Sequence, residues 1–276
     1  MKLLITGAAG QVGEALQTAA EERVLSFSAM TRQQLDISSR ADVERVVTET
    51  GATLIINAAA YTAVDLAEED ADAAYTVNRD GPKTLADVAA KENIPLLHIS
   101  TDFVFDGEKT GAYLETDPCN PLSVYGKSKW EGEKAITDVL SRHVILRTAW
   151  VFGGEKNFVS TMRRLAKERS QISVVNDQRG GPTSAQSIAE ALLTIAFHVD
   201  DPEFCNWGIY HFAGSPSVSW YEFASAILEG DPTTEVLPIP TTDYPTPATR
   251  PQNSVLNCSK IKSVFGIDQP DWRQEL

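Results

Sequence analysis

Tyr125 and Lys129 lie four residues apart and have the clearest capacity for acid–base chemistry in this sequence. On a helix this spacing places both side chains on one face. A lysine ammonium beside a phenol favours the phenolate, so we expect Lys129 to lower the pKa of Tyr125 from about 10 towards the working range of a general acid. A chain with seven tyrosines and eleven lysines also contains such a spacing by chance, so the place of the pair in the fold decides its meaning.

Thr101 ends the apolar stretch Pro95–Thr101, and the segment Asp102–Val124 after it is rich in glycine, proline, aspartate and asparagine. Long loops that leave the carboxyl ends of parallel strands are where α/β folds hold their sites. There the Thr101 hydroxyl can bind the substrate oxygen that Tyr125 protonates, although a lone threonine can also be a cap. A hydroxyl, a phenol and an ammonium around one oxygen suit the reduction of a ketone, because charge develops on that oxygen as hydride reaches the carbon.

The start of the chain runs from the apolar stretch Lys2–Thr6 into three glycines spaced three apart, and then into an amphipathic helix that ends near Arg23. Gly7 can form the tight turn, Gly10 lets the backbone approach a diphosphate, and Gly13 allows close packing of the helix on the strand. The helix start offers free N–H groups and a positive dipole end to phosphates. The pattern favours a bound dinucleotide, while many α/β proteins use the same turn for packing alone.

The residues after this helix bear on the choice of cofactor. Val24–Phe27 is the expected second strand, and in enzymes that prefer NAD an acidic residue commonly ends this strand and binds the ribose 2′-hydroxyl. No acid follows here, and Arg32 lies close by. Arg32 can accept a 2′-phosphate, so NADPH suits the chain at least as well as NADH; the alternative is an exposed arginine without a ligand. Asp36, in the short strand Leu35–Ile37, can contact the adenine or cap the next helix.

Strand and helix patterns alternate along most of the chain, which predicts an α/β fold with a Rossmann-type doubly wound parallel sheet. After about residue 206, short strands and proline-rich connections indicate a smaller, irregular α/β substrate lobe. We expect residues 1–150 and about 171–205 to form the NAD(P)-binding domain, and about 151–170 and 206–276 the substrate-binding lobe. The further expected elements are helices 40–50, 64–75, 78–92, 125–140, 157–170, 184–197 and 220–228, and strands 53–60, 95–101, 143–151 and 172–176.

The composition excludes several classes of partner. The net charge of −14 argues against nucleic acid, because a polyanion needs a basic surface. No apolar stretch approaches the roughly 20 residues of a membrane span, so no membrane partner is expected. Cys119, Cys205 and Cys258 are odd in number and far apart, which argues for reduced thiols and a cytoplasmic protein. The acidic run Glu68–Asp72 is interpreted as a solvated face, and His98 as a core histidine.

Several motifs resemble the extended short-chain dehydrogenase/reductase family, and the likeness covers nearly the whole chain. The glycine turn and the tyrosine–lysine pair identify only that superfamily. The others, as a set, resemble its branch that reduces dTDP-linked ketosugars. The motifs are Thr6–Gly13, Asn57–Asp65, Ser100–Gly107, Tyr125–Lys129, Arg147–Gly153, Asn176–Thr183 and Arg250–Ser254.

The resemblance implies NAD(P)H-dependent reduction of the C4 ketone of dTDP-4-dehydro-6-deoxy-L-mannose to dTDP-L-rhamnose. It implies that Thr101, Tyr125 and Lys129 perform the reduction, and that Thr101, Asp102 and Trp150 contact the sugar nucleotide. Arg250 is a candidate partner of the diphosphate, with a surface ion pair as the alternative. The expected cofactor-binding residues are Gly7, Gly10, Gln11, Val12, Gly13, Arg32, Asp36, Ile37, Ala58, Ala59, Ala60, Tyr61, Thr62, Tyr125 and Lys129.

One departure from the family bears on metal binding. Some members dimerise through magnesium held by glutamates, but Glu14 directly follows Gly13 and is displaced by one position from the early glutamate of those members. We therefore expect no metal, and a homodimer is left open. Two alternative functions are a reductase or epimerase for another sugar nucleotide, and a non-catalytic regulatory subunit of the same fold. The joint presence of Thr101, Tyr125 and Lys129 weighs against a regulator.

Overall fold

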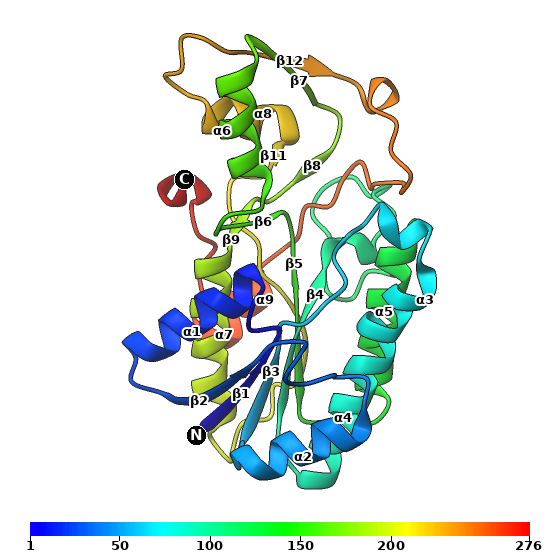
Figure 1. The fold of residues 1–276 in the computed structure, drawn as a ribbon, viewed down its shortest axis with the longest axis vertical. Coiled ribbons are helices and arrows are strands. Elements are labelled where there is room, and N and C mark those ends of the chain that lie inside the picture. Colours follow the sequence, from blue (N-terminus) through cyan, green and yellow to red (C-terminus); the bar gives the residue numbers. More distant parts are fainter.

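The centre of the protein is a six-stranded parallel sheet, seen in a computed structural model that describes all 276 residues (Figure 1). The strand order is β10-β5-β4-β3-β1-β2, so the chain changes direction across the sheet between β1 and β3. Open α/β sheets bind ligands outside the carboxyl ends of the strands at such a point. The strands are β1 (Lys2–Thr6), β2 (Ser26–Met30), β3 (Leu54–Asn57), β4 (Leu96–Thr101), β5 (His143–Thr148) and β10 (Gly208–His211).

Helices cover both faces of this sheet, as the doubly wound prediction requires (Figure 1). Successive side chains of β1 point to opposite faces of the sheet: Leu3 and Ile5 belong to one apolar cluster and Leu4 to another. The first cluster is covered by α1 (Gln11–Glu22) and α7 (Ala185–Val199), and the second by α2 (Arg40–Thr50) and α4 (Gly81–Glu92). The predicted fold class is confirmed.

The helix that carries the tyrosine–lysine pair is α5 (Val124–Thr137). Ser123 caps it by accepting a hydrogen bond from the Gly126 backbone N–H at 3.1 Å. The short 3-10 helix η3 (Asp102–Val104) follows β4 directly and lies against the start of α5. A Cβ atom on Gly126 would lie 2.3 Å from the Phe103 carbonyl oxygen, so only glycine allows the two segments to approach this closely.

The connection from β3 to α4 differs from the predicted pair of helices. It consists of the 3-10 helix η1 (Leu66–Glu68), the short helix α3 (Ala71–Tyr75) and a π-helical turn η2 (Thr76–Asp80) that runs into α4. Asn78 lies within the π turn, fully buried. Such turns are frequent at functional sites, and this one points an amide at the loop that follows β3.

The second lobe has its own small sheets and apolar clusters (Figure 1, top). Its largest sheet pairs β7 (Gln171–Val175) in parallel with β12 (Glu235–Ile239), covered by α6 (Phe158–Glu168) and α8 (Trp220–Ile227). The elements of the chain not yet named are the strand pairs β8 (Arg179–Gly180) with β11 (Val218–Ser219) and β6 (Val151–Phe152) with β9 (Thr183–Ser184), and the helices η4 (Thr241–Asp243), α9 (Ser259–Phe265) and η5 (Trp272–Glu275). Of these, α9 packs on the main sheet.

The predicted division of the chain differs from this arrangement at two places. Strand β7 was expected in the NAD(P)-binding domain, but its partner is β12 of the second lobe. Strand β10 was expected in the substrate lobe, but it pairs in parallel with β5 at the edge of the main sheet, and α9 packs into the first apolar cluster through Ile261 and Phe265. Strand partners come from distant parts of the chain, and the local pattern does not identify them.

Three predicted strands have other ends or are absent. Val24 has a positive φ of 54° and is 90% exposed, so β2 starts only at Ser26. The expected strand 35–37 is a turn, because Asp36 accepts hydrogen bonds from the Ser38 backbone and side chain while Leu35 and Ile37 enter the core. Strand β5 ends at Thr148 rather than 151, since Trp150 has a φ of 47°.

No helix of the protein combines the length and apolar character that crossing a bilayer requires. The three cysteines form no disulfide: Cys258 is buried, Cys119 is half-buried and Cys205 is exposed.

Candidate active site

The glycine turn between β1 and α1 has the shape of a phosphate cradle. Gly7 has a φ of +71°, and a Cβ on it would lie 2.5 Å from the Ala59 nitrogen. A Cβ on Gly13 would lie 2.1 Å from the Gly7 carbonyl oxygen. At Gly10 the only neighbour of a Cβ is that same oxygen, at 3.3 Å, so the outer side of Gly10 is open. Packing therefore requires the first and third glycines, and the middle one leaves room for a ligand.

The start of α1 fits an anionic ligand. Its N-cap, Gly10, has no side chain, so no capping hydrogen bond reaches the first N–H groups of the 12-residue helix. The side-chain oxygen of Gln11 and the hydroxyl of Tyr61 are buried without a hydrogen-bond partner. Open N–H groups and unpartnered polar atoms at one edge of the sheet match a dinucleotide, which offers both phosphates and hydroxyls. Val12 follows Gln11 in α1 and is half-buried.

The loop after β3 carries Ala58, Ala59, Ala60, Tyr61 and Thr62 past this turn, and all five are at least partly exposed. Asn78 fixes the loop: its side chain accepts from the Tyr61 backbone N–H at 2.8 Å and donates to the Tyr61 carbonyl oxygen at 3.0 Å. Sequence reasoning missed Asn78, because an asparagine before a helix resembles an ordinary cap.

The residues expected at the adenosine end have different surroundings. Arg32 is exposed and forms no hydrogen bond or ion pair, so its guanidinium is free for a ligand. Asp36 is exposed and caps its own turn through Ser38, at 2.7 Å from the hydroxyl. Ile37 is buried in the core cluster, where its Cδ1 lies against Gly81.

Thr101 and Tyr125 come together where β4 ends and α5 begins. The Thr101 hydroxyl donates to the Asp102 carboxylate at 3.0 Å and accepts from the Phe103 N–H at 3.2 Å. The Tyr125 ring meets the Phe103 ring edge-on, with centroids 5.6 Å apart. Thr101 also interacts with the Tyr125 phenol and lowers its pKa in part.

The predicted effect of Lys129 on Tyr125 is wrong in this structure. Desolvation is the largest influence on Tyr125 and raises its pKa to about 12, with the Asp102 charge acting in the same direction. Burial lowers the pKa of Lys129 to about 8. The Lys129 Nζ atom donates to the Ile99 carbonyl oxygen at 2.7 Å and lies 3.3 Å from His98 Nε2. The two side chains share a helix face, but the amine is turned towards β4.

Asp102 is the second titratable group at this place. It is 2% exposed, and burial raises its pKa to about 6, partly offset by the hydroxyls of Ser254 and Thr101. Its Oδ2 atom has no hydrogen-bond partner, and neither has the hydroxyl of Thr148, which stands opposite Thr101 in the register of β4 and β5. Thr148 was not predicted; its position at a strand end beside Thr101 is the signal that could have found it.

Trp150 and Arg250 are already engaged by protein groups. The Trp150 indole stacks on Trp220 with centroids 3.6 Å apart, so one of its faces is covered. Arg250 forms a bidentate ion pair with Asp65, at 2.8 and 3.0 Å. The predicted contacts of both residues with a sugar nucleotide stay predictions. The ion pair with Asp65 agrees with the alternative interpretation of Arg250 as an ion-pair residue.

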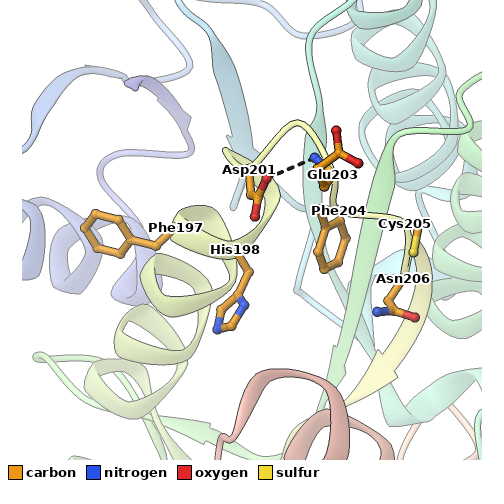
Figure 2. A pocket seen from close by; sticks show the side chains of 7 residues that line it. All are labelled: Phe197, His198, Asp201, Glu203, Phe204, Cys205 and Asn206. Carbon is orange, nitrogen blue, oxygen red and sulfur yellow. Dashed lines mark hydrogen bonds between the residues drawn. The ribbon is translucent and has the colours of Figure 1, made fainter.

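A cavity of about 650 Å³ in the second lobe adjoins Arg250 and Trp220. Its lining is mostly apolar, with Met162, Leu165 and Ile172 among its walls. A different hollow, at the end of α7, is lined by Phe197, His198, Asp201, Glu203, Phe204, Cys205 and Asn206 (Figure 2). The Asp201 carboxylate there accepts a hydrogen bond from the Glu203 backbone N–H at 2.9 Å. That hollow contains none of the predicted site residues.

The site as a whole combines a dinucleotide cradle with a protonated phenol, a threonine hydroxyl and a buried amine at one edge of the sheet. This set can deliver a proton to an oxygen while a neighbouring carbon receives hydride. No group of three histidine, cysteine or acidic side chains lies close enough together to hold a metal ion.

Comparison with known proteins gives a consistent result over the full length. The family model "RmlD substrate binding domain" matches residues 1–276. The chain is 46% identical to dTDP-4-dehydrorhamnose reductase of Aggregatibacter actinomycetemcomitans, over 100% of this chain and 97% of that protein. The crystal structure of a dTDP-4-dehydrorhamnose reductase from Clostridium acetobutylicum superposes with a TM-score of 0.94 at 37% identity, covering 99% and 96% of the two chains. The enzyme from Bacillus anthracis, solved in complex with NADP, gives 0.91 at 34% identity, covering 99% and 96%.

Proposed function

Because this chain belongs to the RmlD substrate binding domain family, we propose that it catalyses the NAD(P)H-dependent reduction of the C4 ketone of dTDP-4-dehydro-6-deoxy-L-mannose to dTDP-L-rhamnose. The observation that carries the proposal is the meeting of Thr101 and Tyr125 at the carboxyl edge of the sheet, in a chain that matches reductases of this substrate from end to end.

Tyr125 is the proton donor in this proposal. Its raised pKa of about 12 keeps the phenol protonated at neutral pH, so the acid is loaded before the substrate arrives. NAD(P)H, when bound, supplies the hydride. The alkoxide that hydride transfer creates is a stronger base than a phenolate, so the Tyr125 proton moves to it favourably.

Thr101 is the second donor to the ketone oxygen. The Thr101 hydroxyl lies within hydrogen-bond distance of Asp102, at 3.0 Å, and rotates to donate to the substrate when the ketone binds. The unpartnered Oδ2 atom of Asp102 is then free to accept from a sugar hydroxyl. Lys129 orients the ribose of the cofactor from the same helix as Tyr125.

The cofactor binds across the glycine turn, with its diphosphate over Gly10 and the first N–H groups of α1, and with further contacts from Ala58 to Thr62. The free guanidinium of Arg32 favours NADPH, and the NADP complex of the Bacillus anthracis relative agrees with that choice. Trp150 and Arg250 are proposed substrate contacts, with Arg250 leaving Asp65 to bind the diphosphate.

Purified protein given dTDP-4-dehydro-6-deoxy-L-mannose is expected to consume NADPH or NADH, with dTDP-L-rhamnose identified by NMR. Tyr125→Phe should lower kcat by 100-fold or more. Tyr210→Phe is the matched control, because that buried phenol bonds only the Asn206 carbonyl, away from the site. Absence of turnover with both cofactors, or full activity of Tyr125→Phe, contradicts the proposal. UDP- and GDP-linked ketosugars in the same assay test the rival substrates.

A homodimer and a cytoplasmic location belong to the proposal as well. The three unpaired cysteines support a reducing compartment. Light scattering of the purified protein tests the dimer, and a monomer mass at assay concentration would contradict it.

A further inference from the structure

Thr148 is a buried threonine that the proposed reaction does not use. It is 3% exposed, and its hydroxyl oxygen has no hydrogen-bond partner. Three other buried side-chain atoms lack a partner, on Gln11, Tyr61 and Asp102, and each of these residues already has a place in the proposed site. A buried hydroxyl without a partner is costly, and it is expected where a bound ligand supplies the missing hydrogen bond. Thr148 therefore points to a further ligand contact.

Two other threonines at strand ends show what Thr148 lacks. Thr6, at the end of β1, donates to the Asn57 side-chain oxygen at 2.6 Å. Thr101, at the end of β4, is bonded to the Asp102 carboxylate at 3.0 Å. Thr148 ends β5 in the same way but has no such neighbour. The protein thus satisfies the hydroxyls at two strand ends and leaves the third open.

The alternation of β5 places the Thr148 side chain on the face of the sheet that α1 covers. Val144 and Leu146 belong to the first apolar cluster, which α1 and α7 cover, whereas Ile145 belongs to the second. Successive side chains of a strand point to opposite faces, so Thr148 shares the face of Leu146. The helix α5 packs on the other face, since its Ile136 lies in the second cluster. Thr148 therefore lies on the side of the helix that follows the glycine turn.

The neighbouring strand end carries Thr101. Thr101 and Thr148 are register partners in β4 and β5, so their backbones are about 4.8 Å apart. The sheet runs in the order β5-β4-β3-β1, with the glycine turn after β1 and the loop Ala58–Thr62 after β3. Along the carboxyl edge, a ligand that starts at the glycine turn therefore meets β3, then Thr101 on β4, and then Thr148 on β5.

The choice of a ligand group for Thr148 rests on the proposed function, in which NAD(P)H is the co-substrate and its diphosphate lies over the glycine turn. Hydride then comes from C4 of the nicotinamide ring, beside Thr101 and Tyr125. The ring carbon next to C4 carries a carboxamide, which has N–H donors and a carbonyl acceptor and can pair with a hydroxyl in either sense. We propose that the Thr148 hydroxyl binds this carboxamide and thereby fixes the orientation of the nicotinamide ring.

The ketosugar is the other ligand at this edge, but its proposed contacts lie beyond the strands. Asp102 is in η3, after β4, and Arg250 lies far along the chain, beside the cavity of the second lobe. Trp150 follows the end of β5 and has a φ of 47°, which ends the strand before the chain enters the second lobe. Thr148 is still part of β5, on the face that α1 covers, so the observations favour the cofactor.

Isothermal titration calorimetry of the wild-type protein and of Thr148→Val tests the contact without turnover. Valine has nearly the shape of threonine but no hydroxyl. NADP⁺ should bind Thr148→Val about 5- to 10-fold more weakly, which is the effect of one lost hydrogen bond. 2′-Phospho-ADP-ribose has the adenosine and the diphosphate but no nicotinamide, so it should bind both proteins equally. A NADP⁺ analogue with an unsubstituted pyridine ring should also bind both equally, because it lacks the carboxamide.

Two further variants separate a ligand contact from a structural role. Thr148→Ser keeps the hydroxyl and should bind NADP⁺ as the wild-type protein does. Nucleotide-free Thr148→Val should unfold at a temperature no lower than that of the wild type, because the hydroxyl it removes has no partner. Thr6→Val is the contrast: it removes a hydroxyl that is bonded to Asn57 and should unfold at a lower temperature.

An equal loss of affinity for NADP⁺ and for 2′-phospho-ADP-ribose overturns the proposal, since it indicates a distorted cradle. An unchanged affinity for NADP⁺ overturns it too, and weaker binding of dTDP-L-rhamnose by Thr148→Val would then assign the hydroxyl to the sugar. If the wild-type protein binds NAD⁺ more tightly, NAD⁺ and ADP-ribose replace the phosphorylated pair. Absence of binding of both dinucleotides contradicts this contact and the proposed function together, whereas binding without reduction of the ketosugar contradicts the proposed function alone.

Discussion

Asn in place of Asp102 should make the protein more stable and less active. Asp102 is 2% exposed, and its pKa is raised to about 6 from the 3.8 of an unperturbed aspartate. At about 1.4 kcal/mol for each factor of ten in proton affinity, the charged carboxylate costs the fold about 3 kcal/mol at neutral pH. Asp102→Asn is nearly isosteric, keeps the acceptor for Thr101 and removes this cost.

The pH dependence of the gain follows from the raised pKa. The folded protein binds the Asp102 proton more tightly than the unfolded chain, so this site stabilises the fold fully below pH 3.8 and loses that contribution as the pH rises through about 6. The advantage of Asp102→Asn should therefore be about 3 kcal/mol at pH 7 to 8, about half of that at pH 5, and close to zero near pH 3.8.

Urea unfolding of the wild-type protein and of Asp102→Asn between pH 5 and 8 measures this difference in stability. The kcat/KM of Asp102→Asn should fall about 10- to 100-fold, because a charged hydrogen bond to the substrate is lost. Asp106→Asn is the control: hydrogen bonds, chiefly from the Glu108 N–H, lower the pKa of Asp106, so its neutralisation should destabilise the fold at neutral pH. A variant at Asp102 that is no more stable than wild type at pH 8, or whose advantage does not shrink towards pH 5, refutes the reasoning.

Four further changes test the glycine cradle, the 2′-phosphate contact and the core. Gly13→Ala should disrupt folding, because its Cβ would lie 2.1 Å from the Gly7 carbonyl oxygen, and the cooperative thermal transition should be lost. Gly10→Ala should fold, because the outer side of Gly10 is open, but it should bind NADPH at least 10-fold more weakly in a fluorescence titration. Arg32→Ala should raise the KM for NADPH about 10-fold and leave that for NADH unchanged; equal effects on both contradict a 2′-phosphate contact. Glu133→Gln leaves the buried charge of Arg147 uncompensated and should lower the free energy of unfolding in urea by about 3 to 5 kcal/mol. Glu168→Gln is the control, because it breaks an exposed ion pair with Arg164 and should leave the free energy of unfolding nearly unchanged.

The fold class could be predicted because its signals are local. Buried apolar runs alternate with amphipathic helices, and the ends of helix 40–50 coincide with a serine cap and a left-handed glycine at Gly51. The division into lobes could not be predicted in detail, because β7 and β10 find their partners far along the chain. The segment 35–37 has a strand-like pattern, and only tertiary burial of its two apolar residues shows that it is a turn.

The positions of Thr101 and Tyr125 were predictable from strand ends and helix starts, whereas their electrostatics were not. Spacing places Lys129 on the face of Tyr125, but it does not show that the amine is turned towards β4 or that both groups are buried. The pKa of the phenol rises because the cost of desolvation exceeds the attraction of any nearby cation. Burial depends on the packing of η3 and the long loop, which no local pattern encodes.

The main sheet does carry one pattern that relates sequence to site. Four of its strands end in a threonine or an asparagine: Thr6 closes β1, Asn57 closes β3, Thr101 closes β4 and Thr148 closes β5. Parallel strands bring these ends to one edge, where an unpaired polar group would be costly unless a neighbour or a ligand engaged it. Thr6 and Asn57 satisfy each other and fix His98, while Thr148 has no partner. The paired ends thus hold each other in place, and the unpaired hydroxyl of Thr148 marks where a substrate is expected.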